Sequence, residues 1–262
     1  LGDVYKRQEL YKAQREETPE VIRQSVPIIK DIIEAYNIPI LEVPRFEADD
    51  VIGTVSKQAE KEGFEVYMMT PDKDYGQLVS EHIFMYRPKF GGDYEVMGVK
   101  EVLNKYSLTS VDQVIDLLGL MGDSSDNIPG IPGVGEKTAT KMIVQFGSIE
   151  NAHEHLEEVK PNKAKESLRE HYDMAQLSKE LATINTDSPL EFSYEKAKVE
   201  NPYTPEAYEL CKRLEFKNML NRFDPVTAAD SSMELEFFTC NDLSGVEALF
   251  EKAARKEQVL SL

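Results

Sequence analysis

Two helical patterns alternate with two short apolar runs in the first part of the chain, and this alternation restricts the fold more than any other feature. The spacing of apolar residues predicts helices over 19–36 and 47–62, and strands over 39–44 and 65–70. Short connections between such elements are typical of parallel strands joined by helices. We therefore expect an α/β fold with a parallel central sheet flanked by helices.

The rest of the chain predicts a hairpin, a long helical region and a further α/β segment. Apolar runs at 83–86 and 94–97 flank Gly91-Gly92-Asp93, which suggests a hairpin at a sheet edge. From residue 99 to about 223 the signals are almost wholly helical, interrupted by a Gly/Pro-rich hairpin at 127–135. Residues 225–233 have the composition of a linker, and 234–262 restart as strand, helix and strand.

The acidic excess limits the partners that the chain can bind by charge alone. Forty-eight acidic residues against 30 basic ones leave a net charge of −18. This balance argues against a basic nucleic-acid coat and against binding to an anionic membrane, so any anionic partner must be held locally. No segment approaches the roughly 20 apolar residues of a membrane helix. We therefore expect a cytoplasmic protein with no membrane partner.

Carboxylates gather at three places where an apolar segment ends. Glu47-Ala48-Asp49-Asp50 opens a helix, and Pro71-Asp72-Lys73-Asp74 follows the strand predicted over 65–70. The third group is Gly122-Asp123-Ser124-Ser125-Asp126, whose two acids would lie on one side of a helical turn. Each group taken alone is equally explained by capping, a turn or an exposed acidic loop. Together they supply seven candidate metal ligands: Glu47, Asp49, Asp50, Asp72, Asp74, Asp123 and Asp126.

Seven carboxylates brought together would repel one another unless cations compensate them. Mg²⁺ or Mn²⁺ suits such a set, because these ions prefer oxygen ligands and need few protein carboxylates when a phosphate supplies the rest. Two such ions about 4 Å apart can activate a water and stabilise a leaving oxygen in phosphodiester hydrolysis. Calcium binding by an EF-hand is a less favoured explanation of these acids, since no Asp-x-Asp-x-Asp-Gly loop with a closing Glu is present.

The second strong signal is a glycine-rich turn that leads into a helix. Gly133, Val134 and Gly135 let the backbone come close to a ligand, and the amides at the following helix start can donate to an anion. Three further donors follow on the same turn: Lys137, Thr138 and Lys141. These groups can hold a DNA phosphate backbone without reading bases. The alternative is a tight connection between two helices that binds no ligand. A Walker loop is excluded because the pattern Gly-x-x-x-x-Gly-Lys-Ser/Thr is missing.

The ordered motifs resemble those of the 5′ nuclease domains of bacterial DNA polymerase I, which are members of the flap endonuclease family. The matching segments run from about Glu9 to Asp224, in this order: Tyr11-Lys12-Ala13-x-Arg15, Glu47-Ala48-Asp49-Asp50, Pro71-Asp72-Lys73-Asp74, Gly122-Asp123-x-x-Asp126-Asn127 and Gly133-Val134-Gly135-Glu136-Lys137-Thr138-Ala139. The resemblance implies a two-metal nuclease that removes RNA primers and 5′ flaps beside a polymerase, in DNA replication and repair.

The resemblance also implies a role for each matching residue. Glu47, Asp49 and Asp50 would belong mainly to the first metal site, and the other four acids to the second. Lys12 and Arg15 would lie in a cationic helical arch as catalytic residues, and Lys73 joins the DNA-binding candidates. The segment 133–138 resembles a helix-hairpin-helix that holds duplex DNA, in this family often through K⁺. The implied substrate is DNA with a 5′ flap or a nicked or primed duplex.

The same resemblance gives the expected domain boundaries. Residues 9–111 would form a partial α/β nuclease core, 112–224 a helical region with the hairpin, and 225–233 a linker. Residues 234–262 would begin a 3′-5′ exonuclease-like domain of the same polymerase chain. Residues 1–8 do not fit the family and are interpreted as foreign sequence. We expect a monomer associated with the bacterial nucleoid.

Two expectations concern activity. The family has an early strand with an Asp, and a further Asp, that find no counterpart here, so the chain is expected to lack its start and to be weakly active or inactive. Residues 258–262 resemble the opening of a strand, so truncation is expected at the other end as well. The alternative function is a non-catalytic duplex DNA-binding module whose acids serve only capping and solubility. A third reading, an RNA-directed nuclease, is disfavoured by the duplex-type hairpin.

Overall fold

The computed structural model describes residue 12 and residues 17–223, which fall into two compact units. The first unit holds residues 12, 17–25 and 39–198, and the second holds 26–38 and 199–223. The predicted linker at 225–233 and the segment 234–262 lie outside the described residues. Within the described part, no helix is long and apolar enough to cross a membrane.

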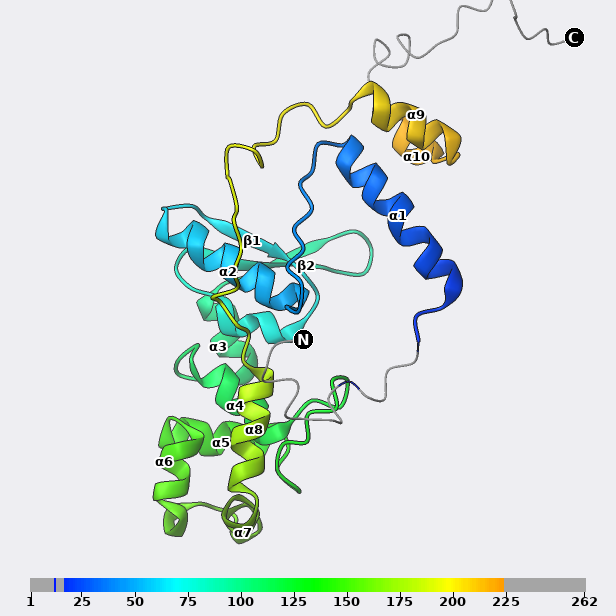
Figure 1. The fold of residues 1–262 in the computed structure, drawn as a ribbon. Helices are drawn as coiled ribbons and strands as arrows, with labels where there is room; N and C mark the ends of the chain where they lie inside the picture. The colour runs from blue at the N-terminus through cyan, green and yellow to red at the C-terminus, as the bar shows by residue number, and fades with distance from the viewer. Residues whose placement is uncertain (1–11, 13–16, 224–262) are drawn as a thin grey trace, which may run out of the picture. The chain divides into compact units, whose positions relative to one another are not determined.

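The first unit contains a three-stranded sheet with the order β1-β2-β3 (Figure 1). Strand β1 (Val66–Met69) pairs in parallel with β2 (Ile83–Pro88), and β2 pairs antiparallel with β3 (Tyr94–Met97). The predicted hairpin at the sheet edge is therefore confirmed. The expectation of a parallel sheet is wrong for β3, because a short hairpin connection returns the chain in the opposite direction.

Alternation along the strands gives the sheet one buried face. The side chains on this face form part of the main core: Met68, Ile83, Met85 and Met97. Tyr67 and Met69 point to the opposite face and are exposed. Packing of the buried face fixes the position of β1. The acidic segment 71–74 therefore begins at the carboxyl end of a fixed strand.

The strand predicted over 39–44 is absent, and this prediction is wrong. The segment has no regular structure and ends in a turn at Pro44 and Arg45. Pro39 and Pro44 have no amide hydrogen, so they cannot donate to a strand ladder. The apolar character of the segment has another reason, since Leu41 packs beside helix α2.

The first two helices lie in the chain where the sequence predicted them. Helix α1 (Glu20–Ala35) and helix α2 (Ala48–Lys61) match the predicted spans, and α2 ends before Gly63, which has φ +88°. Helix α3 (Val99–Tyr106) follows β3. A 3-10 helix, η2 (Lys73–Leu78), follows β1 and contacts α2 and α4.

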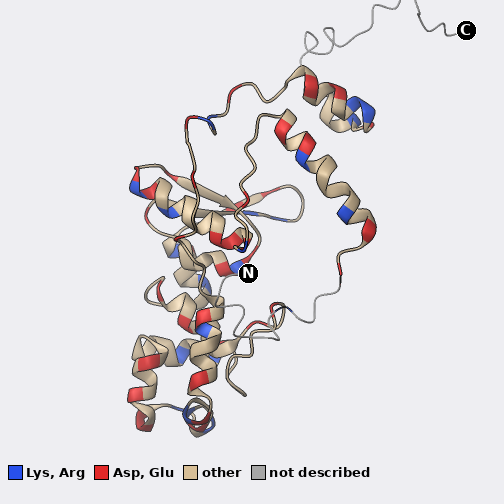
Figure 2. Cartoon of the chain, in the orientation of Figure 1, with Lys and Arg blue, Asp and Glu red and all other residues tan. Residues whose placement is uncertain are grey.

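The remainder of the first unit is helical up to residue 182. The elements are α4 (Gln113–Met121), α5 (Glu136–Phe146), α6 (Ile149–Glu154), η3 (Leu156–Glu158), α7 (Asn162–Glu170) and α8 (Tyr172–Ala182). Helix α4 packs against α8 and α5 (Figure 1). Acidic and basic residues are interspersed along these helices (Figure 2). The helical expectation is wrong for 183–204, which crosses back over α2 as an irregular segment.

An ion cluster around the buried Asp116 joins three of these helices. The Lys179 ammonium lies 2.7 Å from Oδ1 of Asp116 and 3.0 Å from Oε1 of Glu150. Asp116 also accepts a hydrogen bond from the amide of Ile149 at 2.9 Å. Because a buried carboxylate needs such partners, the cluster fixes α4, α6 and α8 relative to one another.

The second unit is small and aromatic. It contains α9 (Pro205–Arg213), α10 (Lys217–Leu220) and the part of α1 from residue 26 onward. The Tyr36 ring packs edge-on against Tyr203 and Phe223, and its hydroxyl lies 3.6 Å from Sγ of the buried Cys211. These contacts give the unit its own core.

Candidate functional site

The first group of acids stands at the start of α2, where Glu47 is the N-cap residue. Asp50 is 1% exposed, and both of its carboxylate oxygens accept hydrogen bonds from amides, at 3.2 Å from Glu47 and 2.9 Å from Asn185. Buried carboxylates are stabilised by such donors. Asp50 therefore anchors the helix start to the segment that follows α8.

Asp49 lies on the same turn and has a different environment. Its Oδ1 accepts a hydrogen bond from the Tyr75 hydroxyl at 2.9 Å. Burial raises the pKa of Asp49, against the opposing effects of the Tyr75 hydrogen bond and the nearby charge of Lys12. Tyr75, on η2, thus connects the first acidic group to the second.

The second group follows β1. Asp72 caps η2, because its Oδ1 accepts from the amide of Asp74 at 3.1 Å. Oδ1 of Asp74 is buried without a hydrogen-bond partner among the described residues. Burial, followed by the charge of Asp72, raises the pKa of Asp74 to about 7. Asp123 and Asp126 add to the rise, and the charge of Lys73 opposes it.

The third group lies in the loop after α4. Asp123 and Asp126 are in a tight turn closed by a bridge between Asp123 and Ile128, not in the expected helical turn. Oδ1 of Asp123 accepts from the Ser125 amide at 2.7 Å, and Oδ2 lies 2.7 Å from the Lys73 ammonium. Burial alone would raise the pKa of Asp123, but the hydrogen bonds from Lys73 and Ser125 lower it.

Lys12 lies at the acidic groups. Its ammonium is 2.5 Å from Oε2 of Glu47 and 3.7 Å from Oδ2 of Asp126, and its amide donates to the Asp126 carbonyl at 3.0 Å. Lys73 compensates Asp123 in the same way, and this pairing raises the pKa of Lys73 although burial alone would lower it. Arg15, the other predicted arch residue, lies outside the described residues.

The fold brings the three groups together. One small pocket is lined by acids from all of them: Glu47, Asp49, Asp74 and Asp126. Its other walls are Ile128 and the segment 181–184 at the end of α8. In the described part of the chain, no three Asp, Glu, His or Cys side chains stand close enough to hold one ion. The carboxylates are thus neighbours, with lysine ammonium groups between some of them.

Sequence reasoning missed the residues that join these groups. Gln77 donates to the carbonyls of Asp74 at 3.0 Å and Ala182 at 2.9 Å, and accepts from the Ile184 amide at 2.9 Å. Tyr75 and Asn185 make the contacts described above. No motif identifies these residues, because their partners lie far away in the sequence.

The predicted hairpin lies between α4 and α5. Gly133 has φ +75°, which disfavours other residues, and Gly135 is the N-cap of α5. The Val134 side chain is buried, so only its backbone can face a ligand. Lys137 and Lys141 are exposed on α5, one turn apart, and Thr138 is half-buried. The hairpin therefore offers helix-start amides and two cations on one helix face.

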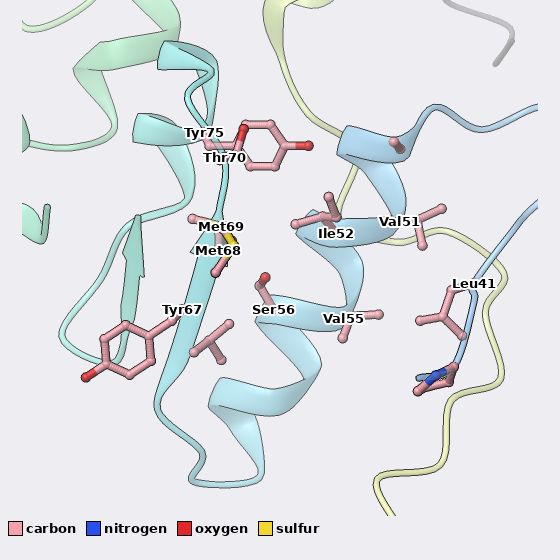
Figure 3. Close-up of a pocket in the computed structure, with 13 residues that line it drawn as sticks. Leu41, Val51, Ile52, Val55, Ser56, Tyr67, Met68, Met69, Thr70 and Tyr75 are labelled. Atoms are coloured by element: carbon pink, nitrogen blue, oxygen red, sulfur yellow. The ribbon is translucent and has the colours of Figure 1, made fainter. Parts of the chain in front are cut away.

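A larger pocket of about 440 Å³ lies between α2 and β1 (Figure 3). Its walls are mainly apolar and include Leu41, Val51, Ile52 and Val55, with Tyr75 at one end. Such a lining suits hydrocarbon groups and offers no charge for a phosphodiester. The acidic pocket is therefore the candidate site.

Sequence comparison agrees with this arrangement. The family described as 5'-3' exonuclease, N-terminal resolvase-like domain, matches residues 5–107, and 5'-3' exonuclease, C-terminal SAM fold, matches residues 109–205. The chain belongs to the 5'-3' exonuclease family.

Its relatives are bacterial DNA polymerases. The chain is 40% identical over 252 residues to DNA polymerase I of Bacillus caldotenax, covering 95% of this chain and 29% of that protein. It is 43% identical over 228 residues to DNA polymerase I of Bacillus subtilis, covering 86% and 26%. The chain thus spans under a third of these relatives and is homologous to their 5′ nuclease portion.

Solved structures show the same fold. Bacteriophage T5 5'-exonuclease, solved with bound zinc, aligns with a TM-score of 0.60 at 18% identity, over 87% of this chain and 80% of that one. A T5 flap endonuclease, solved as a pseudo-enzyme-product complex with DNA and metal ions, aligns with a TM-score of 0.58 at 18% identity, over 88% and 80%. These alignments confirm the flap-endonuclease-like fold.

Proposed function

We propose that the chain carries a metal-dependent nuclease site for DNA with a 5′ flap or a nicked or primed duplex. The observation that carries this proposal is the acidic pocket, which is lined by carboxylates from three separate segments and includes Asp74, whose buried Oδ1 has no hydrogen-bond partner among the described residues. A buried carboxylate oxygen without a donor is costly unless a cation compensates it. Burial and the charge of Asp72 raise the pKa of Asp74 although the charge of Lys73 opposes the rise, which supports a site with an excess of negative charge in the metal-free protein.

The donor set suits Mg²⁺ or Mn²⁺, because it consists of carboxylate oxygens without sulfur or imidazole. Glu47, Asp49, Asp74 and Asp126 would hold the ions directly, with Asp72 and Asp123 beside them. Two bound ions supply an activated water and stabilisation of the leaving oxygen. The zinc-bound T5 5'-exonuclease and the T5 complex with DNA and metal ions support this assignment.

The chain's own residues position the acids and the substrate. Asp50 holds the start of α2 against the segment after α8, so that Glu47 and Asp49 face the pocket. The Lys12 ammonium lies between Glu47 and Asp126, where it can pair with a phosphate oxygen that enters the site. Arg15 and Lys73 are proposed to contact the substrate as well. The hairpin would hold the duplex phosphates, and a K⁺ there is part of the proposal.

The test is cleavage of a 5′-flap DNA under single-turnover conditions with Mg²⁺ or Mn²⁺. Asp74→Ala should lower the cleavage rate at least 100-fold, since a lost metal ligand costs several kcal/mol of transition-state stabilisation. The same variant should bind the DNA within about threefold of the unaltered chain, because DNA is held mainly elsewhere. Asp93→Ala, in the exposed β2–β3 turn, is the matched control and should leave both unchanged.

A non-catalytic DNA-binding module remains the second candidate, favoured by the capping roles of Glu47 and Asp72. It predicts DNA binding without cleavage and without binding of Mn²⁺. Because the chain is expected to be weakly active or inactive, absence of cleavage alone does not separate the two functions, whereas absence of Mn²⁺ binding would contradict the nuclease proposal. We further propose that the chain is part of a bacterial DNA polymerase I, which acts in DNA replication and repair as a monomer associated with the nucleoid.

A further inference from the structure

Three acids share the start of α2, and each is held by a different kind of partner. Asp50 accepts hydrogen bonds from two backbone amides, and Glu47 lies 2.5 Å from the Lys12 ammonium. Asp49 accepts from the Tyr75 hydroxyl at 2.9 Å, the one hydrogen-bond donor to this carboxylate within the described part of the chain. The hydrogen bonding of Asp49 there depends on one side chain of η2.

Burial fixes the Tyr75 ring. The residue is 4% exposed and belongs to the main hydrophobic core. In Figure 3 the ring extends from η2 toward the first turn of α2, with its hydroxyl leading. Because packing restricts the two torsions of the side chain, the donor stands at a defined place before any ion binds.

Asp49 has a second arrangement available to it. It is the second residue of α2, where the backbone amides of the first turn have no partner inside the helix. A carboxylate at this place can turn toward those amides and the positive end of the helix dipole. The hydrogen bond to Tyr75 instead holds Asp49 at the wall of the acidic pocket.

The bond to Tyr75 occupies one oxygen of Asp49 and leaves the other. Oδ1 accepts from the Tyr75 hydroxyl, and Oδ2 accepts no hydrogen bond from the described residues. Carboxylates that ligate metal ions are commonly hydrogen-bonded themselves, and the outer partner sets the direction of the ligating oxygen. Tyr75 also follows Asp74 directly, so one short segment carries a candidate ligand and the residue that orients another.

We propose that Tyr75 is a positioning residue of the metal site, which acts through Asp49: its hydroxyl holds Oδ1 so that Oδ2 faces the ion. The inference rests on the proposed function. The alternative is a purely structural bond that satisfies a buried tyrosine hydroxyl. Loss of the hydroxyl changes the metal affinity in the first case, and only the unfolding free energy in the second.

The test measures Mn²⁺ binding to the full 262-residue chain by electron paramagnetic resonance of the free ion, at pH 8 and without DNA. Tyr75→Phe removes only the hydroxyl and should raise the dissociation constant of Mn²⁺ about tenfold, the usual effect of losing an outer partner of a metal ligand. Tyr106→Phe is the matched control, since Tyr106 is 8% exposed and lies against Gly76 of the same 3-10 helix. It should change the dissociation constant by less than about twofold.

A double-mutant cycle shows whether Tyr75 acts through Asp49. Asp49→Asn alone should weaken Mn²⁺ binding. Adding Tyr75→Phe to it should weaken binding by less than about twofold further, because the carboxylate that Tyr75 positions is already gone. Urea unfolding without divalent cations shows that each variant is folded and measures the structural effect of the lost hydroxyl separately.

The outcomes separate this inference from the proposed function. If the unaltered chain binds Mn²⁺ and Tyr75→Phe binds it as tightly, the inference is wrong and the proposed function stands. If Tyr75→Phe and Tyr106→Phe weaken binding equally, or Tyr75→Phe keeps its full effect in the Asp49→Asn chain, Tyr75 only supports the fold and the inference is again wrong. If the unaltered chain binds no Mn²⁺, the proposed metal site fails and the inference fails with it.

Discussion

At the residue scale, the environment of Asp74 sets its charge. The unfolded chain exposes this carboxyl to water, whereas the fold buries it near Asp72, Asp123 and Asp126 and raises its pKa to about 7. The folded protein therefore binds a proton at Asp74 more tightly than the unfolded chain does. As pH rises from about 4 to 7, the unfolding free energy of the metal-free protein should fall on account of this residue.

Asp74→Asn should remove this loss of stability. At pH 8 without divalent cations, we expect the variant to unfold with a free energy about 2 kcal/mol higher than that of the unaltered chain, and at pH 4 with a similar one. Urea unfolding at the two pH values measures the difference. Asp93→Asn is the exposed control, and an equal gain in that variant would contradict the argument.

Candidate residues also differ from one another in ways that their motif does not show. Glu47, Asp49 and Asp50 stand in one run of four residues, yet only Asp50 has both oxygens occupied by amides. The difference depends on Asn185, which is 135 residues away from Asp50 along the chain. A local pattern can indicate that acids gather, but it cannot show which of them are already satisfied.

At the element scale, helices were predicted better than strands. Helix α2 was predicted from its acidic start and its closing glycine, which are local signals. The false strand at 39–44 had the right apolar residues, but a strand also needs a partner for its backbone groups. The loop after α4 was missed for the same reason. Its bridge between Asp123 and Ile128 depends on the close approach of the Gly122 backbone to the Ile128 carbonyl.

This close approach can be tested with two glycines that both have a positive φ. Gly122 has φ +70°, and a methyl group on it would lie 2.5 Å from the Ile128 carbonyl oxygen; Gly63 has φ +88° and nothing within 4 Å. Gly63→Ala should cost about 1 kcal/mol, the conformational penalty alone. Gly122→Ala should cost about 3 kcal/mol or more, because the backbone at Ile128 must also move.

Thermal or urea unfolding gives both values. Gly122→Ala should also abolish any stabilisation by Mg²⁺, since it displaces the loop that carries Asp123 and Asp126. An equal loss of unfolding free energy in the two variants would show that the Gly122 backbone does not closely approach the Ile128 carbonyl in solution.

At the scale of the whole first unit, the acidic site depends on the return of the chain after α8. The segment 181–184 forms one wall of the acidic pocket, and Gln77 of η2 joins this segment through two hydrogen bonds, with the Ala182 carbonyl and the Ile184 amide. The helical region thus completes the site that the sheet region begins.

Gln77→Ala should therefore destabilise the protein by about 2–3 kcal/mol, because backbone groups of Ala182 and Ile184 lose their partners. Gln176→Ala is a matched control on the exposed side of α8, where the side chain only donates to the Tyr172 hydroxyl at 2.9 Å. It should change the unfolding free energy by less than about 0.5 kcal/mol. A Gln77 variant as stable as the Gln176 variant would refute the role of this connection.

The sequence by itself determined the chemical inventory, the family and the positions of most helices, because caps, glycines and apolar periodicity act within a few residues. Only the tertiary structure decided which carboxylates meet, which are compensated by Lys12 or Lys73, and that the Tyr75 hydroxyl meets Asp49. These properties depend on burial and on contacts between distant segments. Charge and hydrogen bonding change with such contacts, so no local pattern can encode them.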